Sequence, residues 1–137
     1  MRRILKNSPL LWVRTIIYNV RKIYIVEDNE SIREILEIVL SSENYEVKSF
    51  GTVGEFTGRD FTVIPDLYLF DVMLPDGSGI DLCQEIKNDQ NNIGIPVIIM
   101  SAHAHLTQMK DLCQPDDFII KPFDIDNVLK RIQDILN

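Results

Sequence analysis

The stretch LYLFDVMLPDGSGIDL, residues 67–82, places a single acid, Asp71, at the end of a continuous apolar run. A run of this kind is typical of a strand that is buried on both faces of a parallel sheet. Pro75, Gly77 and Gly79 then predict a sharp turn, with glycine supplying backbone angles that other residues resist. Asp71 is therefore expected at the rim of the sheet, where it can meet other polar groups.

Short apolar runs of this kind recur along the chain. Four of them predict strands buried on both faces: KIYIV (22–26), DLYLF (66–70), PVIIM (96–100) and DFII (117–120). The segment YEVKSF (45–50) alternates between apolar and polar residues and predicts an edge strand.

Helical spacing of apolar residues fills the gaps between these runs. The patterns are clearest over 32–40 and 125–136 and shorter over 82–86 and 106–113. The segment 53–60 is the weakest helix, because each of its two glycines costs about 1 kcal/mol relative to alanine. Five strands alternating with five helices predict an α/β fold, with a parallel sheet and helices on both faces.

The charge is distributed unevenly along the 137 residues. Residues 1–22 hold six of the fourteen lysines and arginines and no acid, so residues 23–137 carry all 21 acids against eight bases, a net charge of −13. A domain this acidic binds nucleic acid poorly through non-specific attraction, so no nucleic-acid partner is expected. Clustered acids are instead compatible with a bound divalent cation.

The two cysteines and the N-terminal stretch favour a cytoplasmic protein. Cys83 and Cys113 lack the spacing of a disulfide framework or metal motif and are interpreted as reduced thiols on helices. The chain has no apolar stretch near the length of about 20 residues that spans a bilayer. Arg14 interrupts the apolar part of the N-terminus, and no small-residue cleavage site follows it, so a signal peptide is not predicted.

Polar side chains close four of the predicted strands, at the edge where open α/β sheets bind their ligands. They are Glu27 with Asp28, then Asp71, Ser101 and Lys121. Three crowded carboxylates repel one another unless a cation lies among them, and oxygen ligands of this kind suit Mg²⁺. A carboxylate beside Mg²⁺ can attack phosphorus, and phosphoryl transfer needs mainly positioning and neutralised charge. The set supplies a nucleophile, metal ligands, a lysine and a hydroxyl.

Four segments in this order resemble the receiver domain of the two-component response-regulator family. They are IYIVEDNE, LFDVMLPDGSGIDL, PVIIMSAHA and DDFIIKPF, and the resemblance covers residues 22–136. It implies a flavodoxin-like, doubly wound, five-stranded parallel sheet in the order 2-1-3-4-5. It also implies that a histidine kinase or phosphotransfer protein donates a phosphoryl group to Asp71.

The resemblance assigns the metal ligands residue by residue. Asp28 and Asp71 are expected to bind Mg²⁺ directly, Glu27 directly or through water, and Met73 through its backbone carbonyl. Met73 and His103 also match positions that modulate how fast the phosphoryl group hydrolyses, although His103 could equally be a solvated histidine.

The remaining site residues follow from the same resemblance. Lys121 is expected to pair with the phosphoryl oxygens, and the Lys121–Pro122 peptide bond is expected to be cis. Ser101 and Phe118 match the switch pair, in which the hydroxyl moves toward the phosphoryl group and the aromatic ring turns inward.

Two segments depart from the family pattern. Pro115 lies where the family commonly has Gly-Ala, so the fourth helix is expected to be short and to end by Cys113, and the usual dimer surface is altered. Whether the protein forms a homodimer is left open by the sequence. Residues 1–21 have no counterpart and allow three interpretations: an extra helix on the domain, a biological start at Val20, or a basic amphipathic arm touching membrane or nucleic acid. The arm is the least favoured.

These patterns predict a stand-alone receiver over residues 22–137, which acts as a Mg²⁺-dependent phospho-acceptor switch and signals to a downstream protein. Turnover of a separate substrate is not expected. The alternatives are a receiver-like scaffold that does not cycle, a flavodoxin-type cofactor binder and a metal-dependent phosphatase. A structural alternative for Asp71 is that it caps the helix that begins near Gly79.

Overall fold

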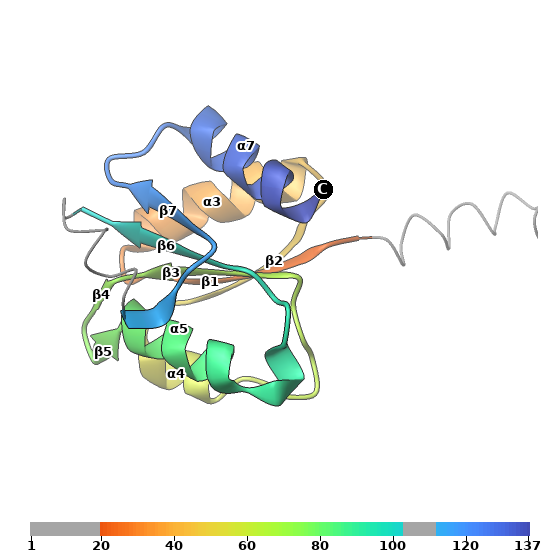
Figure 1. Cartoon of the computed structure of the whole chain (residues 1–137). Helices are drawn as coiled ribbons and strands as arrows, with labels where there is room; N and C mark the ends of the chain where they lie inside the picture. Colours follow the sequence, from red (N-terminus) through yellow and green to blue (C-terminus); the bar gives the residue numbers. More distant parts are fainter. Residues whose placement is uncertain (1–19, 103–111) are drawn as a thin grey trace, which may run out of the picture.

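A five-stranded parallel sheet forms the centre of the computed structural model, which describes residues 20–102 and 112–137 (Figure 1). Its strand order is β2-β1-β3-β6-β7, which confirms the order predicted for the five main strands. The strands are β1 (Lys22–Val26), β2 (Glu46–Phe50), β3 (Leu67–Asp71), β6 (Val97–Ser101) and β7 (Asp117–Ile120). All neighbouring pairs are parallel, so the carboxyl ends of all five strands lie at one edge of the sheet.

Helices cover both faces of this sheet (Figure 1). Two of them, α3 (Glu30–Ser42) and α7 (Ile125–Leu136), pack on one face, and α4 (Val53–Thr57) and α5 (Gly79–Asn88) pack on the other. A short 3₁₀ helix, η1 (Gln90–Asn92), follows α5. The doubly wound α/β architecture is therefore confirmed.

The helix starts follow from side chains that accept hydrogen bonds from the first turn. Asn29 caps α3 by accepting from the backbone N–H of Ile32 at 3.0 Å. Thr52 caps α4 by accepting from the N–H of Glu55 at 3.0 Å. The α4 helix ends at Thr57, earlier than the predicted 53–60, and Gly58 is its C-cap.

Aromatic rings hold the short α4 helix against the sheet. Phe56, the buried residue of α4, makes edge-to-face contacts with three rings, and the centroids lie 5.3–6.0 Å apart. The partners are Phe50, Tyr68 and Phe70. Burial of such rings contributes most of the stability available to a helix of this length.

The β7 strand corrects one prediction. Its sequence DFII predicts a strand buried on both faces, but β7 is the last strand of the sheet and the side chain of Ile120 is 59% exposed. Asp117 and Phe118 are half-buried. Three apolar residues after an aspartate cannot distinguish a central strand from an edge strand, because the sequence of a strand does not show how many neighbouring strands it has. The central strands β3 and β6 are buried at every position, as predicted.

The segment before β7 agrees with the expectation that the fourth helix ends by Cys113, and its predicted shortness is not tested because residues 103–111 are not described. Leu112 and Cys113 are helical, and the helix ends at Cys113, where Gln114 follows with a φ of 55°. Both cysteines are free and buried, as expected, and burial raises the pKa of both thiols. The predicted stripe over 106–111 lies outside the described residues.

Residues 1–19 and 103–111 lie outside the part of the chain that the structure describes, and this includes His103 and the predictions for the N-terminal extension. Within residues 20–102 and 112–137, none of the helices has the length and apolar character that crossing a membrane requires.

Candidate phosphoryl-acceptor site

Three carboxylates meet at the carboxyl ends of β1 and β3. Glu27 and Asp28 follow β1, and Asp71 is the last residue of β3. One oxygen atom from each of the three lies within 4.8 Å of the other two. Glu27 and Asp71 are buried, whereas Asp28 is exposed. The structure therefore brings together the three acids that the sequence analysis predicted as metal ligands.

The side chain of Lys121 joins this cluster from the end of β7. Its Nζ atom lies 2.7 Å from Oε1 of Glu27 and 3.0 Å from Oδ2 of Asp71. The backbone N–H of Lys121 donates to the carbonyl of Ser101 at 2.8 Å, which fixes the start of the loop after β7. The Lys121–Pro122 peptide bond is cis, the geometry that the family resemblance implies.

Burial dominates the electrostatics of Glu27. Its side chain is fully buried, and burial is the largest cause that raises the pKa of its carboxyl to about 8, followed by the adjacent carboxyl group of Asp71. Burial opposes the charge of Lys121, but the hydrogen bonds to Glu27 and Asp71 outweigh it and raise the pKa of the ammonium. Ionisation of the Glu27 carboxyl therefore needs positive charge beyond that of Lys121.

A divalent cation fits this donor set. Among the described residues, Oε2 of Glu27 is a buried oxygen atom without a hydrogen-bond partner. Buried polar atoms in native structures have partners as a rule, so an orphaned carboxylate oxygen beside two further acids indicates a place for a cation. An all-oxygen site open to water on the Asp28 side matches the ligands that Mg²⁺ prefers.

A hairpin that the sequence analysis missed follows the acceptor strand. It consists of β4 (Met73–Leu74) and β5 (Gly77–Ser78), which pair antiparallel. The side chain of Met73 is 63% exposed on this hairpin. The carboxylate of Asp76 at its tip accepts from the backbone N–H groups of Val53 and Gly54 at 2.8 and 2.9 Å, and these hydrogen bonds lower the pKa of Asp76. The hairpin is thereby attached to the start of α4.

Gly77 and Gly79 are needed in this hairpin for space. A Cβ atom on Gly79 would lie 2.1 Å from the carbonyl oxygen of Asp71, and one on Gly77 would lie 2.9 Å from Cγ2 of Val53. Neither glycine has a positive φ, so the expectation that they supply unusual backbone angles is wrong. The N–H of Gly79 donates to the carbonyl of Val72 at 3.0 Å, which holds the returning chain against the acceptor strand.

Ser78, and not Asp71, caps the helix that follows. The side chain of Ser78 accepts from the N–H of Ile80 at 3.1 Å at the start of α5. The carboxylate of Asp71 is bonded to Lys121 instead. The structural alternative for Asp71 is therefore wrong.

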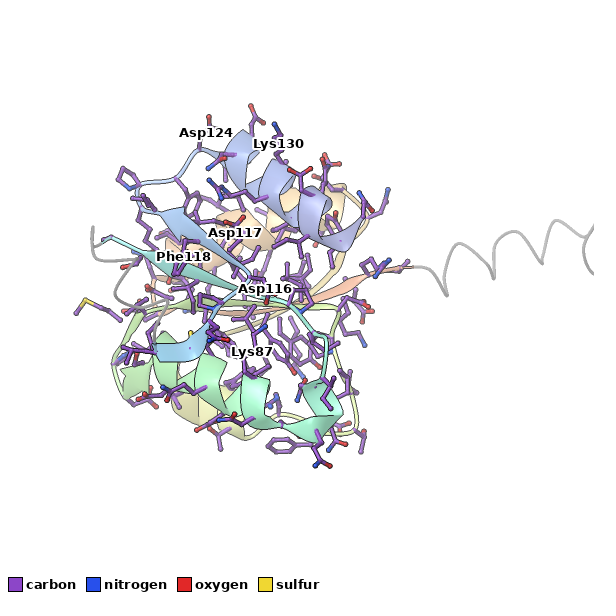
Figure 2. The ribbon with its side chains drawn as sticks, in the orientation of Figure 1. Lys87, Asp116, Asp117, Phe118, Asp124 and Lys130 are labelled. Atoms are coloured by element: carbon purple, nitrogen blue, oxygen red, sulfur yellow. The ribbon has the colours of Figure 1, made fainter. Side chains whose placement is uncertain are left out.

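The two residues predicted as a switch pair lie on one face of the sheet. Ser101 ends β6, is fully buried and pairs with Ile120 of β7. Phe118, labelled in Figure 2, lies two residues before Ile120 on the same strand. The register of β6 and β7 therefore directs the side chains of Ser101 and Phe118 to the face covered by α5. The half-buried ring of Phe118 packs against the core on this face. A ring in this position can move relative to Ser101 without crossing the sheet.

Arg33 is a further residue that the sequence analysis missed. It lies in the first turns of α3, and its Nη1 atom donates to the backbone carbonyls of Glu27 at 2.8 Å and Asp28 at 3.1 Å. The sequence signal for this contact is an arginine in the helix that follows the acidic strand end. The signal does not identify the contact, because any residue offers a backbone carbonyl as an acceptor.

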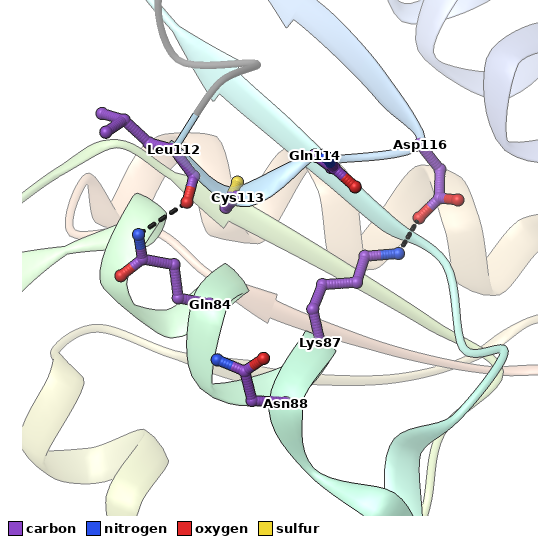
Figure 3. A pocket seen from close by; sticks show the side chains of 7 residues that line it. All are labelled: Gln84, Lys87, Asn88, Leu112, Cys113, Gln114 and Asp116. Atoms are coloured by element: carbon purple, nitrogen blue, oxygen red, sulfur yellow. Dashed lines mark hydrogen bonds and ion pairs between the residues drawn. The ribbon is translucent and has the colours of Figure 1, made fainter.

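A separate pocket lies between α5 and the segment that leads into β7, and it contains none of the clustered acids (Figure 3). Across it, Nζ of Lys87 lies 2.5 Å from Oδ2 of Asp116, and Nε2 of Gln84 donates to the carbonyl of Leu112 at 2.6 Å. These polar groups are hydrogen-bond partners of one another, so the contacts across the pocket hold α5 against the segment before β7.

Comparison with known proteins agrees with this geometry. Residues 23–133 match the model of the response regulator receiver domain. The chain belongs to this family. This receiver domain is 35% identical over 122 residues to response regulator ArlR of Staphylococcus aureus, an alignment that covers 84% of this chain and 52% of ArlR.

Two further similar proteins support the assignment. RpaA of Synechocystis sp., a DNA-binding dual master transcriptional regulator, is 32% identical over 122 residues, covering 84% of this chain and 48% of RpaA. The receiver domain spans about half the length of these two curated relatives. The BeF₃-activated receiver domain of DrrB, from Thermotoga maritima, matches with a TM-score of 0.75 and 27% identity, covering 85% of this chain and 97% of that domain.

Proposed function

We propose that this receiver domain accepts a phosphoryl group on Asp71 from a histidine kinase or phosphotransfer protein, in the presence of Mg²⁺, and passes the signal to a downstream protein through its changed surface. The observation that carries the proposal is the meeting of three carboxylates and one lysine at the carboxyl end of β3. Family membership supports the same activity.

The transfer requires little covalent chemistry from the protein. An oxygen atom of the Asp71 carboxylate attacks the phosphorus, the P–N bond to the donor histidine breaks, and the leaving imidazole keeps the electron pair and takes up a proton. Lys121, now 3.0 Å from the Asp71 carboxylate, is placed to pair with the oxygens of the transferred group. Ser101 offers its hydroxyl at the neighbouring strand end.

The metal ligands in this proposal are Asp28, Asp71, Glu27 and the backbone carbonyl of Met73. Bound Mg²⁺ supplies positive charge that offsets the repulsion between these carboxylates and the incoming phosphoryl oxygens. The orphaned buried oxygen of Glu27 supports this assignment, because it is a ligand atom for which the described residues offer no partner. Its buried place beside the other two acids is compatible with binding the cation directly or through water.

The output is a change of surface, with no released product beyond inorganic phosphate when the switch resets. In this proposal, Ser101 moves toward the phosphoryl group and Phe118 turns inward on the same face of the sheet. Residues 22–137 form the receiver unit, and residues 1–21 are an extension to it.

Intact mass spectrometry tests the acceptor. The protein is incubated with Mg²⁺ and acetyl phosphate, and we expect the parent to gain the mass of one phosphoryl group. Asp71→Asn is expected to gain none. Asp81→Asn, which changes an exposed acid in the first turn of α5, is the matched control and is expected to behave as the parent.

Two results would contradict the proposal. An unmodified parent would exclude phospho-acceptance under these conditions, and equal modification of the parent and Asp71→Asn would place the acceptor elsewhere. The switch is tested with beryllium trifluoride, the activating ligand of the DrrB receiver domain. We expect it to shift the NMR signals of Ser101 and Phe118 in the parent only when Mg²⁺ is present.

A further inference from the structure

The three clustered acids are not held equally. Oε1 of Glu27 and Oδ2 of Asp71 both accept hydrogen bonds from Lys121. Asp28 is exposed, and within residues 20–102 and 112–137 its carboxylate makes no hydrogen bond or ion pair. Its direction therefore depends on its backbone.

Arg33 holds this backbone on both sides of Asp28. One nitrogen, Nη1, lies 2.8 Å from the carbonyl oxygen of Glu27 and 3.1 Å from the carbonyl oxygen of Asp28. These two carbonyls belong to the peptide planes before and after Asp28, and the two planes together define its φ and ψ. A guanidinium that fixes both planes also fixes the direction of the Cα–Cβ bond of Asp28.

The position of the guanidinium is itself restrained. Arg33 lies on α3, where its backbone N–H donates to the carbonyl of Asn29 at 3.0 Å. A Cβ atom on Gly51 would lie 3.0 Å from Nη1 and 3.4 Å from Cζ, so the guanidinium occupies the space that a side chain at Gly51 would take. Arg33 thus lies between the turn after β1 and the turn after β2 and is half-buried there.

We propose that Arg33 is a positioning residue for the divalent-cation site and acts through the backbone of Asp28. The inference rests on the proposed function, since it concerns the same cation. Whether the removal of Arg33 tightens or weakens Mg²⁺ binding distinguishes a positioning role from a purely electrostatic one. If Arg33 acted only through its charge, its removal would reduce repulsion and tighten Mg²⁺ binding. If it positions a ligand, its removal must weaken Mg²⁺ binding.

Calorimetric titration with Mg²⁺ distinguishes these two effects without any phosphoryl transfer. We expect Arg33→Ala to raise the dissociation constant for Mg²⁺ about tenfold or more, the range found when residues that orient a metal ligand are removed. Arg33→Lys is expected to give an intermediate value, because an ammonium can reach one carbonyl but lacks the planar guanidinium.

Arg59 offers a matched control for this experiment. Its Nη1 atom also donates to a backbone carbonyl, that of Phe56, at 3.0 Å, and its guanidinium stacks on the rings of Phe56 and Phe61 away from the acids. We expect Arg59→Ala to leave the Mg²⁺ affinity of the parent unchanged. An equal loss in Arg59→Ala and Arg33→Ala would mean a general loss of structure and would overturn the inference.

A double-mutant cycle shows whether Arg33 acts through Asp28. In an Asp28→Ala background, we expect Arg33→Ala to change the Mg²⁺ affinity less than twofold, because the ligand that it positions is gone. A full tenfold loss in that background would overturn the inference, as would unchanged or tighter binding by Arg33→Ala alone. A parent that binds no Mg²⁺ would instead contradict the proposed function itself. If Arg33→Ala fails to fold by circular dichroism, Arg33→Gln takes its place with the same expectations.

Discussion

The Nζ atom of Lys121 lies 2.7 Å from Oε1 of Glu27, although 94 positions separate the two residues in the sequence. The contact joins the end of the edge strand β7 to the end of the central strand β1. Among the described residues it gives the buried carboxylate of Glu27 its only cationic partner, and the same nitrogen of Lys121 also contacts Asp71. One lysine thus faces two buried carboxylates, and this imbalance determines how the site responds to mutation, pH and metal.

Removal of the lysine is expected to destabilise the fold. Lys121→Ala leaves Glu27 and Asp71 without their shared partner, and removing one member of a buried ion pair costs about 3 kcal/mol or more. Chemical denaturation at pH 7 without Mg²⁺ measures the change in the free energy of unfolding. The exposed Lys130 on α7 is the control, and Lys130→Ala is expected to change that free energy by less than about 0.5 kcal/mol. Equal effects of the two substitutions would show that the Lys121 contacts contribute nothing specific.

The raised pKa of Glu27 predicts that stability without Mg²⁺ falls as the pH rises. Burial raises the pKa of the Glu27 carboxyl from its ordinary 4.5 to about 8, so the folded state holds a proton that the unfolded state has released between these values. The stabilisation that this proton gives to the folded state is complete below about pH 4.5 and is lost as the pH rises toward 8. Its slope reaches at most about 1.4 kcal/mol per pH unit.

Glu27→Gln tests this pH dependence. The amide keeps the shape of the carboxyl but does not titrate, so the free energy of unfolding of the variant is expected to vary less between pH 5 and pH 8 than that of the parent. Saturating Mg²⁺ is expected to reduce the slope in the parent, because a cation favours the ionised carboxylate. Parallel pH profiles for the parent and Glu27→Gln would show that Glu27 titrates normally.

The parallel sheet and the meeting of the acids could be predicted from the sequence, because both follow from local patterns. Buried parallel strands read as continuous apolar runs, and the residues that end them, such as Asp71 and Lys121, must gather at one edge. This reasoning needs no knowledge of side-chain geometry. It fails for β7, where Ile120 is exposed and which is the last strand of the sheet among the described residues, a fact that concerns the whole sheet.

The supporting contacts could not be predicted because their acceptors or donors are backbone groups. Arg33 donates to two carbonyls, and Asp76 accepts from two N–H groups that lie 22 and 23 positions earlier in the chain. Any residue offers such groups, so only the fold selects the ones that are used. The role of Gly79 was predicted for the wrong reason in the same way, since its lack of a side chain matters only against the neighbouring strand.

Gly79→Ala is expected to disturb the acceptor strand directly. The new Cβ atom would lie 2.1 Å from the carbonyl oxygen of Asp71 and 3.1 Å from Cβ of Phe70, so the backbone of β3 or of the turn has to move. Overpacking in a core costs about 1–3 kcal/mol, and a clash with backbone atoms belongs at the upper end of this range. Gly58→Ala is the matched control, because its Cβ atom would meet nothing closer than 3.6 Å. Denaturation should show a loss of about 3 kcal/mol for Gly79→Ala alone, together with slower phosphorylation by acetyl phosphate at temperatures where the variant is folded. A Gly79→Ala protein as stable and as reactive as Gly58→Ala would mean that the turn after Asp71 yields without moving the acceptor carboxylate.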